Sequence, residues 1–138
     1  KPKHSVVVLT RNHRIDYVKA VAPSFEVVPC RHKEFTFAEQ IGLPIILVVG
    51  LKLGCINHAI LTVGAIQSRN LRIAGWIGNT LTPEMQFLSE NIETLCSKID
   101  APFLGLIPEL PSELKEAAHS PYTIEALECA AQHIQLPK

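Results

Sequence analysis

A glycine-containing turn after an apolar segment is the part of this sequence best suited to bind a ligand. Residues 44–49 are uniformly apolar, and the chain then reads Gly-Leu-Lys-Leu-Gly-Cys-Ile-Asn. This pattern predicts a parallel strand buried on both sides, followed by a helix over residues 57–67. The N–H groups at a helix start attract anions, so the turn is a candidate site for a carboxylate or phosphate, with Lys52 nearby. An ordinary turn with a surface lysine is the alternative interpretation. The backbone amides concerned are those of Gly54, Cys55, Ile56 and Asn57.

Two further strand ends carry groups that suit a nucleotide. Asn79 and Thr80 follow a predicted strand over residues 71–77, and an asparagine side chain offers both the donor and the acceptor that a purine edge requires. The carboxyl ends of parallel strands meet at one edge of a sheet, so we expect all three turns there. A turn-forming asparagine and a strand-ending proline are the alternative interpretations. The candidates at the last strand end are Pro108, Glu109 and Leu110.

No catalytic residue and no metal ligand is assigned from the sequence. The chain has no Gly-x-x-x-x-Gly-Lys-Ser/Thr phosphate loop and no histidine pair at helical i, i+4 spacing. The four cysteines are scattered without a Cys-x-x-Cys pair, and we interpret them as reduced thiols. Cys55 lies at a helix N-terminus, where a thiol is reactive in some proteins, but we expect a small buried hydrophobe there. The cysteines are Cys30, Cys55, Cys96 and Cys129.

Composition predicts one domain over residues 1–138. The chain is 47% hydrophobic but only 6% aromatic, which favours the aliphatic core typical of α/β layers. Thirteen basic and thirteen acidic side chains balance, so no electrostatic feature favours nucleic acid or an anionic membrane as a partner. No apolar run approaches the roughly 18–20 residues of a membrane span, and we expect a cytoplasmic protein.

Strand and helix patterns alternate along the chain and predict a parallel sheet flanked by helices. Helices are expected over residues 16–22, 35–41 and 57–67, from Thr82 onward, and from either Ser120 or Thr123. Strands are expected over residues 5–9, 25–28, 44–49, 71–77 and 103–107.

Apolar residues at helical spacing indicate which side of each helix is buried. The expected buried residues of the helix over 57–67 are Ile60, Leu61, Val63 and Ala65. For the helix after Thr82 they are Phe87, Leu88, Ile92 and Leu95. For the last helix they are Ile124, Leu127, Ala131 and Ile134.

Three blocks of the sequence resemble the signature of dethiobiotin synthetases. Residues 43–62 contain Lys-Leu-Gly-Cys-Ile-Asn-His, which is highly specific for that family. Ala-Gly-Trp-Ile-Gly-Asn at residues 74–79 and Ala-Pro-Phe-Leu-Gly-Leu-Ile-Pro at residues 101–108 follow at the family's spacing. The resemblance extends over residues 35–110. It implies part of a three-layer α/β fold similar to the P-loop NTPases.

The resemblance also implies a function and a set of site residues. Dethiobiotin synthetases are homodimers that use ATP and Mg2+ to carboxylate 7,8-diaminononanoate with CO2 and to close the ureido ring of dethiobiotin. The helix start matching Gly54 to Asn57 would hold the substrate carboxylate across the dimer interface. Asn79 would recognise adenine together with its neighbour Thr80. The same pocket would be completed by Pro108, Glu109 and Leu110.

Several family features have no counterpart in these residues. They are the Gly-rich phosphate loop, the catalytic lysine, the metal-binding aspartate and the acidic glycine loop, and residues 1–33 match no part of the family. We therefore expect the C-terminal half of a dethiobiotin synthetase, without activity on its own. A non-catalytic relative that binds nucleotide, and a purely structural α/β interaction module, are the alternatives.

Overall fold

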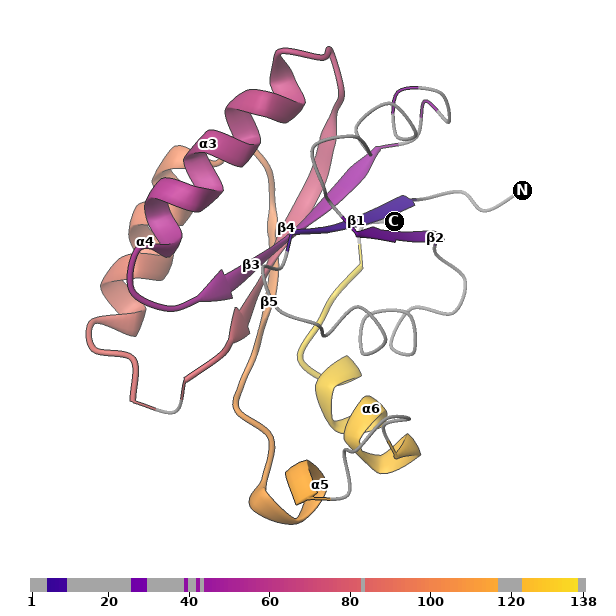
Figure 1. The fold of residues 1–138 in the computed structure, drawn as a ribbon, viewed down its shortest axis with the longest axis vertical. Coiled ribbons are helices and arrows are strands. Elements are labelled where there is room, and N and C mark those ends of the chain that lie inside the picture. Colours follow the sequence, from indigo (N-terminus) through magenta and orange to yellow (C-terminus); the bar gives the residue numbers. More distant parts are fainter. Residues whose placement is uncertain are drawn as a thin grey trace.

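The computed structural model describes residues 5–9, 26–29, 39, 42, 44–82, 84–116 and 123–136. In this part of the chain, five parallel strands form one sheet in the order β2-β1-β3-β4-β5 (Figure 1). The strands are β1 (Ser5–Leu9), β2 (Glu26–Pro29), β3 (Ile45–Leu51), β4 (Ile73–Thr80) and β5 (Phe103–Ile107). The described helices are α3 (Cys55–Gln67), α4 (Leu88–Lys98), α5 (Ser112–Glu116) and α6 (Ile124–Ala131).

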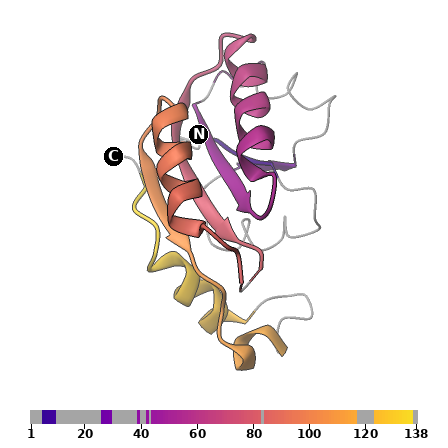
Figure 2. The ribbon, with the colours of Figure 1, turned by 90° about the vertical axis from the view of Figure 1, so that its left-hand side faces the viewer.

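Helices cover both faces of the sheet, as the apolar strands require. Alternate residues of β3 face opposite layers: Leu47 packs in the core under α3 and α4, whereas Val48 packs in the core that includes Ala130 of α6. Figures 1 and 2 show α3 and α4 side by side on one face. Burial on both faces explains the continuous apolar pattern of β3. The predicted three-layer, P-loop-NTPase-like α/β fold is confirmed.

Both central strands are longer than predicted, which corrects the expected ends at residues 49 and 77. The β3–β4 ladder continues through Gly50 paired with Asn79 and Leu51 paired with Thr80. At Gly50 the missing Cβ leaves room for the side chain of Leu81, whose Cδ1 would lie 2.6 Å from that atom. Gly50, the expected strand end, is therefore an internal residue of β3 where another side chain approaches closely.

Helix α3 starts two residues earlier than predicted, at Cys55. Gly54 precedes it with φ 85°, a left-handed conformation that glycine adopts without strain. The prediction that Ile60 and Leu61 are buried is wrong, since they are 40% and 72% exposed. A stripe of mostly small residues faces the sheet instead, which allows close packing. Its members are Cys55, Ala59, Val63 and Ile66.

Helix α4 starts at Leu88, so the predicted start at Thr82 is wrong. Phe87 precedes the helix with φ 57° and is 67% exposed, which also corrects its expected burial. Leu95 is fully buried, and Leu88 and Ile92 pack against the same core, as predicted. The Phe87 carbonyl accepts hydrogen bonds from both the backbone and the side chain of Asn91, which favours the later start.

The final helix begins after Thr123, one of the two predicted starts. The Thr123 hydroxyl accepts a hydrogen bond from the Ala126 N–H at 3.3 Å, as an N-cap residue does. Its buried side chains are Ala126 and Ala130, whereas Ile124 is 69% exposed and Ala131 is also exposed. The predicted apolar stripe is therefore wrong at those two positions, because the small alanines face the sheet.

Other predictions have mixed outcomes. Strand β5 has the bounds predicted, and β2 lies one residue later than expected. The short helix α5 was not predicted. The helix expected over residues 16–22 lies outside the described residues, as does most of the one over 35–41, of which Glu39 is described as helical.

The segment after α6 packs along β5. The Gln135 N–H donates to the Leu104 carbonyl at 2.8 Å. Gly105 has φ 146°, and a Cβ added there would lie 1.9 Å from the His133 carbonyl oxygen. The segment after α6 therefore passes so close to β5 at Gly105 that only glycine fits there.

Candidate functional site

The predicted nucleotide residues meet at the carboxyl edge of the sheet. Asn79 pairs with Gly50 on one side and with Ile107 on the other, and Pro108 follows directly. Leu110 packs against the α6-side core, whereas Pro108 and Glu109 are half-buried. Strand register therefore brings together residues that are far apart in the sequence.

Asn79 is the buried polar side chain of this edge. It is only 6% exposed, and it is the one polar residue that is buried within the described part of the chain. Its side-chain amide makes no hydrogen bond to another described residue. An amide side chain carries both a donor and an acceptor, so at this position it can pair with a ligand that reaches the edge of the sheet.

Thr80 lies on the other face of the sheet from Asn79. Side chains alternate along a strand, and Ile77 belongs to the α6-side core whereas Trp76 belongs to the core under α3 and α4. Asn79 therefore projects to the α6 side and Thr80 to the side of α3 and α4. The Thr80 hydroxyl oxygen is buried and has no hydrogen-bond partner. The two neighbours in sequence thus offer polar groups to different layers.

The start of α3 leaves several backbone amides available. We call Gly54, Cys55, Ile56 and Asn57 the carboxylate cradle, after the ligand that the sequence predicts for them. The Cys55 N–H already donates to the Lys52 carbonyl at 3.0 Å, within the turn, and the His58 N–H makes the first helical bond, to Gly54. The amides of Ile56 and Asn57 have no carbonyl acceptor among the described residues. Gly54 and Asn57 are exposed, so this end of the cradle is open to solvent.

Asn91 contacts the cradle, and sequence reasoning missed it. The Cys55 thiol donates to the Asn91 side-chain oxygen, with 3.9 Å between sulfur and oxygen. The two residues lie on different helices, 36 positions apart, and no spacing rule links them.

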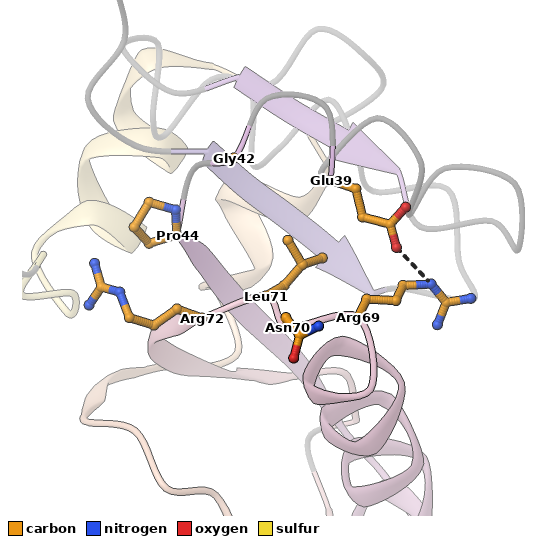
Figure 3. A pocket seen from close by; sticks show the side chains of 7 residues that line it. All are labelled: Glu39, Gly42, Pro44, Arg69, Asn70, Leu71 and Arg72. Atoms are coloured by element: carbon orange, nitrogen blue, oxygen red, sulfur yellow. Dashed lines mark ion pairs between the residues drawn. The ribbon is translucent and has the colours of Figure 1, made fainter.

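A cavity lies at the opposite, amino edge of the sheet (Figure 3). It has a volume of about 280 Å³, and none of the predicted site residues lines it. The Arg69 side chain turns toward Glu39, with 3.3 Å between Nε and Oε1, whereas Arg72 points the other way. The arginines therefore do not converge on a common point. The lining residues are Glu39, Gly42, Pro44, Arg69, Asn70, Leu71 and Arg72.

Comparison with protein families shows which family the chain belongs to. A family model described as an AAA domain matches residues 31–117, more than half of the chain. The chain belongs to the AAA domain family. The matched residues include β3, α3, β4, α4 and β5. They therefore include every candidate site residue.

Curated relatives of this AAA domain are named ATP-dependent dethiobiotin synthetase BioD. The protein of Aromatoleum aromaticum is 51% identical over 80 residues, which is 58% of this chain and 36% of the relative. That of Ralstonia nicotianae is 58% identical over 74 residues, 54% of this chain and 32% of the relative. Escherichia coli K12 BioD 1 is 49% identical over 96 residues, 67% of this chain and 43% of the relative. The resemblance to dethiobiotin synthetase is confirmed.

The chain spans about a third to two-fifths of the length of these relatives. Within the described ranges of this AAA domain, no group of three or more His, Cys, Asp or Glu side chains is placed to hold a metal ion. None of its described helices is both long and apolar enough to cross a bilayer.

Proposed function

We propose that this chain supplies the adenine-recognising and substrate-carboxylate-binding part of an ATP-dependent dethiobiotin synthetase. The enzyme would act in the cytoplasm as a homodimer, converting 7,8-diaminononanoate, CO2 and ATP to dethiobiotin. The observation that carries the proposal is the position of Asn79, a largely buried polar residue at the carboxyl edge next to the end of β5, within a segment similar to BioD proteins.

Asn79 provides the nucleotide half of the site. Its carboxamide has a donor and an acceptor side by side, which matches the amino group and ring nitrogen of adenine. Guanine presents the opposite pattern at the corresponding edge. The adjacent Pro108 and Leu110 supply apolar surface for the base, and Glu109 lies between them. Thr80, which was also expected to bind the nucleotide, faces the opposite layer and does not contribute to this pocket.

The carboxylate cradle provides the other half. The partial positive charge at the start of α3 attracts the carboxylate of 7,8-diaminononanoate, and the amides of Ile56 and Asn57 donate to it. The cradle and Asn79 lie at the same edge, since Gly50 pairs with Asn79 four residues before Gly54. Holding both ligands at one edge reduces the entropic cost of bringing them together.

ATP and Mg2+ fit this chain to different degrees. Adenine fits, because Asn79 offers a buried amide to it. Mg2+ does not fit the described residues, because they include no group of three or more His, Cys, Asp or Glu side chains that could hold it. The sequence also has no phosphate loop.

Binding to the purified chain tests the proposal. In calorimetric titrations, we expect the chain to bind ATP more tightly than GTP and to bind 7,8-diaminononanoate. We expect no ATP-dependent incorporation of labelled CO2 above background by this chain alone, because its sequence has no phosphate loop. Failure to bind either ligand at millimolar concentration would instead support a structural α/β module.

Replacing Asn57 by proline tests the cradle. Asn57 is the third residue of α3, so its N–H has no helical acceptor; proline removes this N–H and also distorts the start of the helix. We expect Asn57→Pro to weaken the binding of 7,8-diaminononanoate by about tenfold, as the loss of a hydrogen bond to a charged group predicts. Asn57→Ala keeps the amide and is expected to retain binding. Equal losses in both variants would assign the role to the side chain and not to the backbone.

A further inference from the structure

Asn91 connects the starts of two helices. Its backbone N–H and its side-chain Nδ2 both donate to the Phe87 carbonyl, at 2.9 and 2.7 Å. With Nδ2 engaged in this way, Oδ1 accepts from the Cys55 thiol of α3. A thiol is a weak donor and an amide oxygen is an acceptor, so both ends of the Asn91 side chain are matched.

Cys55 links Asn91 to the carboxylate cradle. It is the first residue of α3 and is 2% exposed. Its N–H is bound to Lys52 in the turn, and its thiol is bound to Asn91 on the other side. The amides of Ile56 and Asn57 follow immediately along the same turn. Any displacement of Cys55 therefore changes the direction in which those two N–H groups point.

We propose that Asn91 is a positioning residue for the carboxylate cradle. It fixes Cys55 and, through Cys55, the amides that hold the substrate carboxylate; contact between Asn91 and the substrate is not required. The inference rests on the proposed function, because the cradle is assigned to 7,8-diaminononanoate there. The alternative is that Asn91 only stabilises the first turn of α4.

Titration of 7,8-diaminononanoate into the purified chain and its variants tests this role. We expect Asn91→Ala to raise the Kd for 7,8-diaminononanoate about fivefold, which is the effect of one hydrogen bond. The Kd for ATP is expected to change by less than about twofold. Cys55→Ala is expected to weaken binding in the same direction. The double variant should be no weaker than Asn91→Ala alone, because the two residues act through one contact.

Thr94→Val is the matched control. The Thr94 hydroxyl donates to the Glu90 carbonyl at 2.8 Å, so this variant also removes a side-chain bond to the α4 backbone. We expect it to leave the Kd for 7,8-diaminononanoate unchanged, and thermal unfolding measures the stability of every variant. A loss of stability without a change in Kd for Asn91→Ala would overturn the proposal. If the parent chain does not bind 7,8-diaminononanoate, the proposed function falls and this inference falls with it.

Discussion

Replacing Gly105 by alanine is expected to destabilise the protein by about 3 kcal/mol, one of the largest effects of a single methyl group in this chain. The added Cβ would lie 1.9 Å from the His133 carbonyl oxygen, a backbone atom that cannot rotate away. The left-handed φ of 146° adds strain for any residue with a side chain. The segment after α6 must therefore move away from β5, and the bond from Gln135 to Leu104 is lost.

Urea unfolding measures this effect. Trp76 is the chain's single tryptophan and is fully buried, so its fluorescence reports the transition. Gly64→Ala is the matched control, since Gly64 lies inside α3 with no atom within 4 Å of an added Cβ. We expect that variant to be more stable by about 0.5–1 kcal/mol. Equal free energies of unfolding for the two variants would mean that residues 133–135 do not pack on Gly105.

Replacing Asn79 by leucine is expected to separate ligand binding from stability. Leucine has the same branching at Cγ but no polar atoms, so it removes the pair of hydrogen bonds proposed for adenine. ATP affinity is expected to fall by about 10–100-fold, as the loss of a bidentate base contact predicts. The free energy of unfolding should change little, because a largely buried polar side chain is replaced by an apolar one with the same branching.

Calorimetric titration with ATP and GTP, together with urea unfolding, checks both parts of this prediction. We expect the preference for ATP over GTP to disappear in Asn79→Leu. Asn70→Gly is the control: Asn70 lies at the opposite edge of the sheet with φ 56°, a conformation that glycine tolerates. It should leave nucleotide binding unchanged. Unaltered base selection in Asn79→Leu would show that adenine binds elsewhere.

Sequence signals that act over only a few residues correctly predicted where some strands and helices begin and end. Pro102 and Pro108 mark the two ends of β5, and Thr123 forms the cap of α6 that its type favours. The lengths of β3 and β4 were not predictable in the same way. Gly50 reads as a strand end, and only the approach of Leu81 shows why glycine stands inside the strand.

The same distinction applies to the site. That Asn79 and Pro108 lie at one edge of the sheet was predictable, because the carboxyl ends of parallel strands meet there. The start of α4 was placed at Thr82 because threonine, proline and glutamate form a good local signal, whereas the side chain of Asn91 favours a start after Phe87. The contact of Asn91 with Cys55 depends on how two helices pack, which a single sequence does not specify.

The alternation of side chains along β4 has a consequence for how this protein could change in evolution. Asn79 and Thr80 are adjacent in the chain but belong to layers divided by the sheet backbone. A substitution at Asn79 therefore need not alter the layer to which Thr80 belongs. If the proposed function holds, the preference for a base can change in evolution while the packing of the other layer is kept.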